Sequence, residues 1–316
     1  MGFKEAAEAL RSVGLAGLTT HLILGGSWVL GSPAMVVAVV VASRLNAPIV
    51  AASVLVLGTL QFVLSPKPWP GFARFLRDCG THGYYASCTM QLPKADIKRS
   101  KSMLCYHPHG IECVGYSFNG IHSPEMMRYE ATYIIASGIF YLPIFSIICY
   151  WLGNVKSATA QTMRDVMGRG KNVALLPGGF EDATVMVKGQ ERIYLKHRKG
   201  FVKFALRYGY AVYPVYTFGE SDTFATFTKF PGFRLWLNQY KIPAVLAWGN
   251  PWLPFLPRPE ARLHTAFGEP IEFPKIESPT DADVDLWHTK YVTELVNLFE
   301  THKAQAGYGD RTLMVL

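Results

Sequence analysis

The residues best suited to chemistry lie in YHPHG, residues 106–110, where one proline separates two histidines. An imidazole titrates near neutral pH, so it can take a proton from an alcohol that attacks a carbonyl carbon. The glycine that follows permits a tight turn and a close approach of a ligand to the backbone. We therefore predict that His107 and His109 are catalytic and that Gly110 belongs to a substrate-binding turn.

The same histidines allow a rival interpretation. Histidines at i and i+2 of an extended segment face one side and could share a metal ion, as in a metallohydrolase acting on lipid esters. The sequence holds no HExxH motif or similar cluster to supply a third ligand, so we expect no metal. Cys105 and Cys113 flank the pair and could carry an acyl group, but such cysteines more often pack as small apolar residues.

A second glycine-rich turn, PGGFED, covers residues 177–182. Its backbone N–H groups could stabilise a developing oxyanion, and a carboxylate near the histidines would orient the base, as in catalytic triads. The turn residues predicted to bind substrate are Pro177, Gly178 and Gly179. The candidate carboxylates are Glu112, Glu181 and Asp182, and the sequence does not choose among them.

A basic stretch, YLKHRKGF, precedes an amphipathic pattern that predicts a helix over residues 197–209, capped by Gly209. Helix N-termini bind phosphates, and neighbouring cations reinforce this binding. A charged turn in solvent explains the stretch equally well. The residues predicted to contact a phosphorylated substrate are Arg198, Lys199, Gly200 and Phe201.

Two uncharged apolar stretches near the N-terminus, residues 22–43 and 47–65, are close to the length of about 20 residues that crosses a bilayer. Soluble helices usually alternate polar and apolar faces, so we expect a membrane hairpin rather than a buried pair of helices. The flanking cations are Lys4 and Arg11 before the pair, and Lys67, Arg74 and Arg77 after it. The positive-inside rule then places both termini in the cytosol. Glycines and a proline weaken the first helix, which leaves a shallow re-entrant hairpin open.

Prolines 66, 68 and 70 mark the end of the hairpin, because proline cannot continue a helix. We therefore divide the chain into an N-terminal segment, residues 1–66, and one α/β domain, residues 67–316. The strands expected in this domain are residues 102–106, 131–135, 172–176, 210–218, 244–248 and 263–267. Three loops with unusual residues follow predicted strands, namely HPHG (107–110), PGGFED (177–182) and GESDTF (219–224). Ligands of open α/β sheets bind at the carboxyl ends of strands, so we expect these loops to converge on one cleft.

Two further segments are apolar or helical. The uncharged stretch 133–153 is interrupted by Gly138 and Pro143, so we expect a buried strand followed by a hydrophobic helix that faces the surface or dips into the membrane. A long C-terminal helix is expected to begin with Ser278 as its cap and Pro279 in its first turn.

Composition narrows the class of partner. The net charge is +8, but the cations are dispersed and no nucleic-acid-binding motif is present, so anionic lipids and phosphorylated substrates explain the charge better. The five cysteines form no CxxC pair, which indicates a reducing compartment without a disulfide framework. The sequence leaves the oligomeric state open.

These motifs together resemble one family. YHPHG, PGGFED, RKGFVKFALRYGYAVYPVYTFGE, FGEPIEFPK and the C-terminal PTDADVDLWHTKYVTELVNLFETHK are similar, in this order, to the type-2 diacylglycerol acyltransferases, which include monoacylglycerol and wax-alcohol acyltransferases. The resemblance implies an enzyme of the endoplasmic reticulum and lipid droplets that transfers an acyl chain from acyl-CoA to diacylglycerol. Transfer from a thioester to an ester is downhill, so we expect that this reaction requires no cofactor. It implies catalytic roles for His107 and His109 and a cytosolic, mixed-sheet domain like that of glycerolipid acyltransferases. His107 and Glu112 have the H-x4-D spacing of those enzymes, with Glu for Asp. A scaffold of lipid droplets without turnover is the non-enzymatic alternative.

Overall fold

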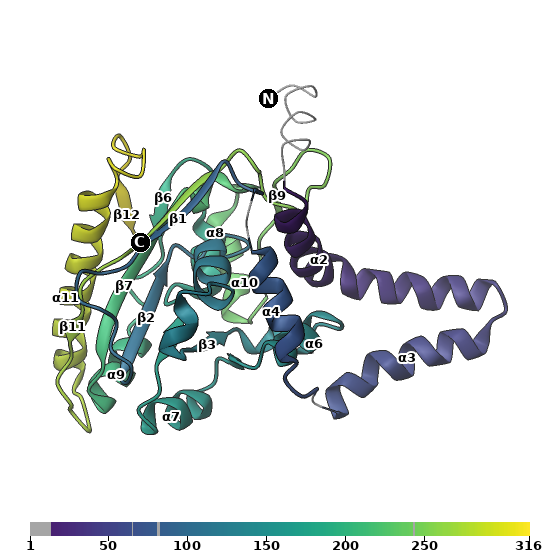
Figure 1. Ribbon diagram of the computed structural model, residues 1–316, viewed down its shortest axis with the longest axis horizontal. Coiled ribbons are helices and arrows are strands. Elements are labelled where there is room, and N and C mark those ends of the chain that lie inside the picture. Colours follow the sequence, from purple (N-terminus) through teal and green to yellow (C-terminus); the bar gives the residue numbers. More distant parts are fainter. Residues whose placement is uncertain (1–13, 65, 81–82, 243) are drawn as a thin grey trace.

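The computed structural model describes residues 14–64, 66–80, 83–242 and 244–316. Its centre is an eight-stranded sheet of order β1-β10-β7-β2-β5-β3-β4, with β11 paired to β7 (Figure 1). The strands are β1 (Ser87–Gln91), β2 (Ser102–His107), β3 (Thr132–Ile135), β4 (Val155–Ser157), β5 (Val173–Leu175), β7 (Ala211–Phe218), β10 (Arg262–Phe267) and β11 (Ile271–Glu272). Strands β7, β2, β5, β3 and β4 run parallel, whereas β10 and β11 are antiparallel to β7. The expected mixed α/β architecture is therefore confirmed.

One predicted strand is wrong. Of residues 244–248, only β9 (Ala247–Trp248) is extended, and it pairs with β8 (Ala225–Thr226) outside the main sheet. Leu246 and Trp248 are 67% and 46% exposed, so the apolar side chains of this segment point outward instead of into a sheet. Strand β1 was missed because it alternates exposed and half-buried residues at the sheet edge and carries few apolar side chains.

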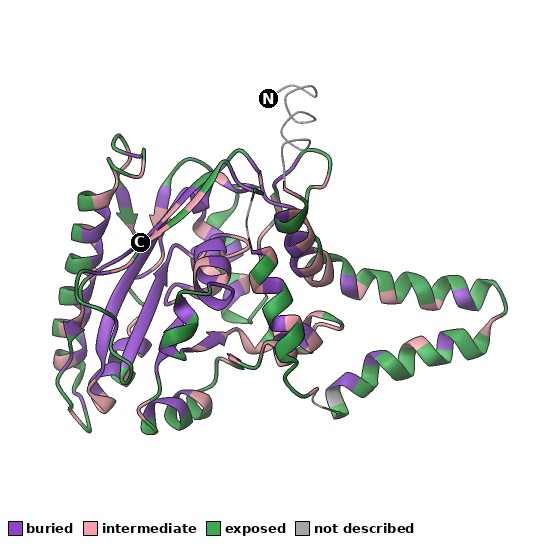
Figure 2. Cartoon of the chain, viewed as in Figure 1, coloured by how far each residue is buried: buried purple, intermediate pink, exposed green. Residues whose placement is uncertain are grey.

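Both faces of the sheet are covered, because alternate residues of the central strands point to opposite sides. Met103 and Cys105 of β2 pack with α7 (Ala160–Gly168), α9 (Gly200–Tyr208) and α11 (Asp281–His302). Leu104 and Tyr106 pack on the other face with α5 (Val114–Tyr116), the π-turn Ser117–Ile121, the 3₁₀ turn Met126–Tyr129 and α6 (Phe145–Leu152). Figure 2 shows these strands almost wholly buried.

The two predicted helices of the domain form with shifted starts. Helix α9 begins at Gly200, not at residue 197, and ends as expected on Gly209 in the left-handed conformation, with φ of 63°. Helix α11 is capped by Thr280, not Ser278. The Thr280 hydroxyl accepts from the Asp283 N–H at 3.2 Å, and the Asp283 carboxylate accepts from the Thr280 N–H at 2.9 Å. This reciprocal capping box satisfies more of the free N–H groups than Ser278 could.

The stretch 133–153 is broken as the sequence predicts. Strand β3 leads into a 3₁₀ turn, Ser137–Tyr141, and then into α6, whose Ile148 and Cys149 are buried in the domain. The remaining elements are α4 (Pro70–Cys79), α8 (Gly179–Val185), the 3₁₀ turn Glu220–Asp222, α10 (Pro231–Gln239), and the pair β6 (Glu191–Ile193) and β12 (Leu313–Val315).

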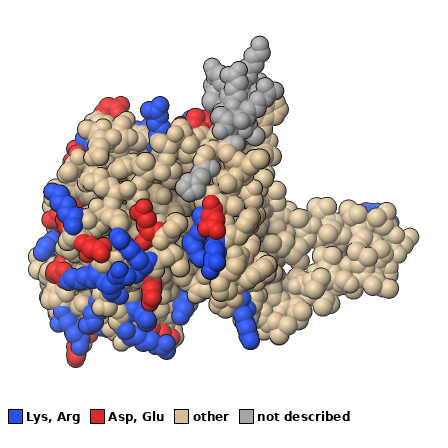
Figure 3. Space-filling model, viewed as in Figure 1, with Lys and Arg blue, Asp and Glu red and all other residues tan. Residues whose placement is uncertain are grey.

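Two apolar helices, α2 (Leu15–Arg44) and α3 (Pro48–Val63), pack together as a hairpin that projects from the domain (Figure 1). Helix α2 starts seven residues before the expected residue 22, because its first turns pack on the domain through Gly17, Thr20 and His21. Among the described residues, α2 is the helix whose length and composition suit a membrane crossing. The hairpin is mostly exposed in Figure 2 and almost uncharged in Figure 3, with blue only near its tip.

Candidate active site

His107 is the last residue of β2 and is 1% exposed. Its Nε2 lies 2.8 Å from the hydroxyl of Tyr291 on α11, and its Nδ1 has no hydrogen-bond partner among the described residues. Burial lowers the pKa of this imidazole to about 3, because a charged ring loses its hydration there. His107 is therefore a neutral ring held beneath the site by the C-terminal helix.

His109 lies two residues further on and is partly exposed. Its Nδ1 is 2.9 Å from the carbonyl oxygen of Gly110, and since a carbonyl only accepts, Nδ1 must carry the proton. That tautomer leaves the lone pair on Nε2, which lies 3.8 Å from Sγ of Cys113. Burial lowers the pKa of His109, while the Gly110 carbonyl and the nearby charge of Glu181 raise it in part. At neutral pH the ring is a neutral base.

Asp182 joins three segments around the histidines. Its Oδ2 accepts from the His109 backbone N–H at 2.8 Å, and its Oδ1 accepts from the Tyr194 N–H at 2.5 Å. The carboxyl is 2% exposed, and burial raises its pKa to about 7 against the lowering effect of these two hydrogen bonds. Asp182 thus positions the backbone of His109 and does not bind an imidazole.

The position of the Asp182 carboxyl explains why residue 178 is a glycine. A Cβ added to Gly178 would lie 2.5 Å from Cγ of Asp182, closer than real Cβ contacts allow. Next to it, Gly179 has φ of 59°, a conformation that favours glycine. The glycine-rich turn therefore lets Asp182 fold back over its own helix start and reach the HPHG loop.

Glu181 points the other way and pairs with Arg198, with Oε1 and Nη1 3.3 Å apart. The Arg198 Nε also donates to the carbonyl of Pro177 at 3.0 Å, so its guanidinium brackets the glycine-rich turn. The side chain of Arg198 remains 38% exposed. Of the predicted phosphate-binding residues, Arg198 is the one that the structure brings beside the turn.

The other predicted phosphate-binding residues have different surroundings. Lys199 pairs with Asp285 on α11 at 2.5 Å, and Phe201 is buried with its ring edge against Tyr291. Gly200 is exposed and has no neighbour within 4 Å of a Cβ built there. A hollow of about 370 Å³ lies beside Lys199, but Asp281 and Asp285 line it as well. Phosphate binding at this helix start stays a prediction.

Glu112 does not contact either histidine of the HPHG loop. Its Oε2 lies 3.6 Å from Nε2 of His21 on α2, and its side chain is only 8% exposed. Burial raises the pKa of Glu112 well above its usual range, and the neighbouring charge of Glu220 adds to this. Neither carboxyl oxygen has a hydrogen-bond partner among the described residues. The H-x4-E spacing therefore places this carboxyl between the hairpin and the domain.

The sequence reasoning missed Glu220, which follows β7. Its carboxylate is fully buried and accepts from the backbone N–H groups of Val114 at 2.9 Å and Gly115 at 3.0 Å. A Cβ on Gly110 would lie 2.3 Å from its Oε1. Burial raises the pKa of Glu220 to about 7, partly offset by the two N–H donors. The signal in the sequence was the acid directly after the long β7 strand in the motif FGE.

The site shows neither a reactive cysteine nor a metal-binding cluster among the described residues. Cys105 is buried, and Cys113 Sγ lies 3.3 Å from Nδ1 of His109, while burial raises the pKa of both thiols. A buried thiol with a raised pKa is a poor nucleophile. Within the described part of the chain, no three His, Cys, Asp or Glu side chains are grouped to hold a metal ion.

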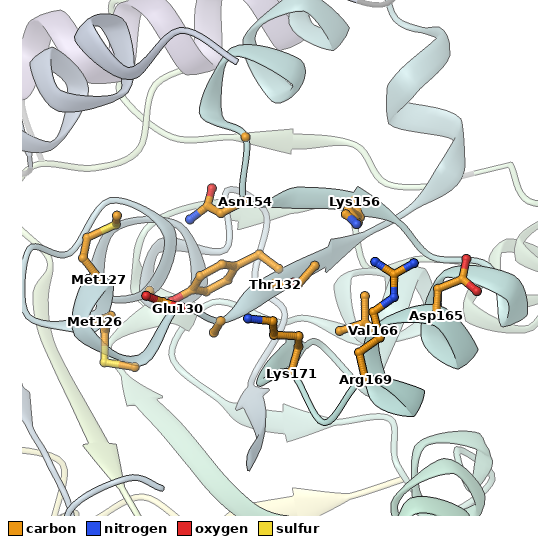
Figure 4. Close-up of a pocket in the computed structure, with 14 residues that line it drawn as sticks. Met126, Met127, Glu130, Thr132, Asn154, Lys156, Asp165, Val166, Arg169 and Lys171 are labelled. Carbon is orange, nitrogen blue, oxygen red and sulfur yellow. The ribbon is translucent and has the colours of Figure 1, made fainter. Parts of the chain in front are cut away.

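A cavity of about 500 Å³ lies elsewhere, at the amino ends of β3, β4 and β5 (Figure 4). Lys156, Arg169 and Lys171 surround it together with Met126 and Met127. The HPHG loop and the glycine-rich turn follow the carboxyl ends of β2 and β5. This cavity is therefore distinct from the candidate active site.

The fold and the site define a mixed α/β protein in which a histidine loop and a glycine-rich turn meet beyond the carboxyl ends of parallel strands. Comparison with known families gives a match to the diacylglycerol acyltransferase family over residues 65–316. The chain belongs to this family.

Individual relatives agree with that assignment. The chain is 31% identical over 226 residues to 2-acylglycerol O-acyltransferase 3 of Homo sapiens, covering 64% of each protein. It is 31% identical over 240 residues to diacylglycerol O-acyltransferase 2 of Xenopus tropicalis, covering 66% of this chain and 63% of that one. For the Homo sapiens diacylglycerol O-acyltransferase 2, the identity is 30% and the shares are 64% and 56%. The chain spans less than two thirds of the length of these relatives.

Among solved structures, the chain is similar to the crystal structure of the 1-acyl-sn-glycerophosphate acyltransferase PlsC from Thermotoga maritima. The match covers 91% of this chain and 95% of that one, with 10% identity and a TM-score of 0.42. A likeness of this degree supports no conclusion about the site or the activity.

Proposed function

We propose that the protein is an acyl-CoA-dependent O-acyltransferase that converts diacylglycerol to triacylglycerol, with His109 as general base. The family match together with the state of His109 supports this most directly. The ring is neutral, its Nδ1–H is fixed on the Gly110 carbonyl, and its Nε2, 3.8 Å from Sγ of Cys113, carries the lone pair that accepts a proton. Acyl-CoA and the lipid alcohol are the two substrates, and the reaction needs no cofactor.

In this mechanism Nε2 of His109 takes the proton of the acceptor hydroxyl while the hydroxyl oxygen attacks the carbonyl carbon of the thioester. We assign the resulting oxyanion to the glycine-rich turn, where the Gly178 N–H would donate to it, since the Gly179 N–H already donates to the Leu176 carbonyl oxygen at 3.3 Å. When the tetrahedral intermediate collapses, the C–S bond breaks and the CoA thiolate takes the proton from the imidazolium. Burial favours this last step, because it makes the charged ring of His109 a stronger acid.

The carboxyls act as positioning residues in this account. Asp182 holds the His109 backbone, and Glu220 holds the start of α5, which follows the HPHG loop, at Val114 and Gly115. His107 supports the loop from below through Tyr291. Arg198, partly exposed beside the turn, is the cation best placed to meet a CoA phosphate.

The hairpin would hold this cleft at a membrane, and we propose the cytosolic face of the endoplasmic reticulum or a lipid droplet. Gly31 of α2 packs against Pro143 and Ile144, and Gln61 of α3 accepts a hydrogen bond from the Ile144 N–H at 3.1 Å. Both limbs of the hairpin, α2 and α3, are therefore fixed to the domain at these points. Each limb beyond them is about 20 Å long, shorter than a hydrocarbon core of about 30 Å. The lengths favour a hairpin that enters one leaflet and returns, with both termini on one side.

A second candidate acceptor is a monoacylglycerol, because 2-acylglycerol O-acyltransferase 3 is among the relatives at 31% identity. The test is to give the purified chain, reconstituted in vesicles, labelled acyl-CoA with mono-, diacylglycerol and fatty-alcohol acceptors. Triacylglycerol from diacylglycerol as the fastest product supports the first candidate. Faster formation of diacylglycerol from monoacylglycerol supports the second.

The same assay addresses a metal-dependent hydrolase. We expect chelators to leave transfer unchanged and free fatty acid to remain a minor product. Loss of activity on chelation that zinc restores would refute a base-only mechanism.

A further inference from the structure

One long segment of the domain carries no acidic residue. Between Asp222 and Glu260 the charged residues are Lys229, Arg234, Lys241 and Arg258, and aromatic residues recur throughout. This segment includes β8, α10 and β9, and the acyl-transfer mechanism uses none of it.

The apolar side chains of this segment are turned outward. Six of them, which we call the aromatic face, are between 46% and 70% exposed: Phe230, Phe233, Trp236, Tyr240, Leu246 and Trp248. On α10, the ring centroids of Phe233 and Trp236 are 5.7 Å apart, and those of Trp236 and Tyr240 are 5.1 Å apart. A contiguous row of large exposed rings indicates an interaction surface, since isolated apolar residues are normal on soluble surfaces but patches are not.

The aromatic face is built on a fixed base. On the opposite side of α10, the buried Arg234 donates through Nε to the Ala244 carbonyl at 2.8 Å. Asn238, also buried, donates to Oγ1 of Thr184 at 2.7 Å. Thr184 belongs to α8, which begins at the glycine-rich turn with Asp182. The polar side of α10 is therefore held inside the protein by Nε of Arg234 and by Asn238, although Nη2 of Arg234 has no hydrogen-bond partner among the described residues. Its apolar side is exposed in the part of the chain that the structure describes.

The same segment adjoins the base of the hairpin. A Cβ built on Gly25 of α2 would lie 3.6 Å from both Cδ2 of Leu256 and the carbonyl oxygen of Phe255. Figure 1 shows the light-green loop after β9 beside the first turns of α2. The segment that carries the aromatic face is thus packed against the base of the hairpin.

We propose that the aromatic face docks on an anionic lipid leaflet, as a second membrane contact separate from the hairpin. Trp and Tyr are favoured at the membrane interface, and an amphipathic helix with Trp and Phe on one face lies in that plane. Lys229 and Lys241, both exposed, flank the face and would meet acidic headgroups, with no acidic side chain in the segment to oppose them.

Docking has a consequence for the site. Because α10 rests on α8, the lipid surface would lie one helix away from the glycine-rich turn and Asp182. A lipid alcohol could then reach His109 from the leaflet without passing through water. The docking itself holds whether or not the chain transfers acyl groups.

The test uses the full chain in vesicles of phosphatidylcholine, with and without phosphatidylserine. An environment-sensitive fluorophore is attached to Trp236→Cys, and the matched control is Thr293→Cys, an exposed position on α11. The wild-type chain, treated identically, corrects for the native cysteines. We expect the label at 236 to shift to the blue and to be quenched by brominated lipid tails, while the label at 293 stays in water.

The charge contribution is tested with Lys229→Gln and Lys241→Gln. We expect the docked-to-undocked ratio of the 236 label to fall about five-fold per lysine in phosphatidylserine vesicles and to change little in pure phosphatidylcholine. A label at 236 as exposed to water as the one at 293 overturns the proposal and points to a protein partner instead. If the docked-to-undocked ratio of the 236 label is the same with and without phosphatidylserine, the assignment of an anionic leaflet is overturned. Neither result bears on acyl transfer, which is measured separately.

Discussion

Replacing Glu220 by glutamine is expected to disturb the loop that carries His109. In the wild type, the two carboxylate oxygens accept from the N–H groups of Val114 and Gly115 in a fully buried position. The amide of glutamine offers one acceptor oxygen, and its NH₂ group faces the other N–H donor. One buried N–H is then unpaired, which costs about 1–3 kcal/mol of the free energy of unfolding.

The effect on catalysis follows from the same contact. The Glu220 side chain also packs against Gly110, where a Cβ would lie 2.3 Å from Oε1, so the loop must shift when this group turns. A displacement of about 1 Å at a reacting group lowers a rate about 100-fold. We therefore expect the rate of acyl transfer by Glu220→Gln to fall about 10- to 100-fold.

The assay measures transfer of labelled acyl-CoA to diacylglycerol in vesicles and, in parallel, urea unfolding followed by circular dichroism. The matched control is Glu272→Gln, an exposed carboxylate paired with Lys98 at 2.6 Å. An exposed pair contributes about 1 kcal/mol or less, so this control should keep its activity and nearly all its stability. Wild-type rate and stability in Glu220→Gln would show that this carboxylate does not position the loop.

Three further predictions concern the neighbouring contacts. Tyr291→Phe leaves Nε2 of the buried His107 unpaired, so the free energy of unfolding should fall by about 1–2 kcal/mol in urea titrations; no change would remove the role of this hydroxyl. Gly178→Ala places a Cβ against Asp182, so the free energy of unfolding should fall by about 1–3 kcal/mol and most of the activity should be lost. The control Gly138→Ala, whose Cβ would have no neighbour within 4 Å, should behave as the wild type. Equal activities of the two variants would refute the packing argument. Burial raises the pKa of Asp182 and Glu220 to about 7 in the folded chain, whereas a carboxyl in the unfolded chain titrates at about pH 4. The contribution of these groups to the free energy of unfolding is therefore complete below about pH 4 and is lost as the pH rises through about 7. Asp182→Asn should make the plot of unfolding free energy against pH less steep by about 1 kcal/mol per pH unit in this range, and an unchanged slope would contradict the prediction.

The sheet was predictable because its strands are short apolar runs that end in turns. β2, β3, β5, β7 and β10 all lie within about two residues of the expected ranges. The prediction of a core strand at residues 244–248 was wrong, because the sequence shows that these residues are apolar but not which way their side chains face. Two of the side chains, Leu246 and Trp248, are exposed and belong to the aromatic face, and the sequence pattern does not distinguish outward apolar residues from buried ones.

The site was predictable in its loops but not in its contacts. Spacing suggested that Glu112 would serve His107, yet three-dimensional packing turns Glu112 toward His21 on the hairpin. Glu220, more than 100 residues from the HPHG loop, reaches it because β7 lies beside β2 in the sheet. Such a neighbour depends on strand order, which local sequence patterns do not reveal.

The most direct test of the proposed mechanism is the rate of acyl transfer from labelled acyl-CoA to diacylglycerol by His109→Ala in vesicles. The matched control is His302→Ala at the end of α11, and circular dichroism checks that both variants fold. If Nε2 of His109 is the general base, the rate of His109→Ala should fall about 10²- to 10⁴-fold while the control keeps its rate. A folded His109→Ala chain that transfers at the wild-type rate would contradict the mechanism.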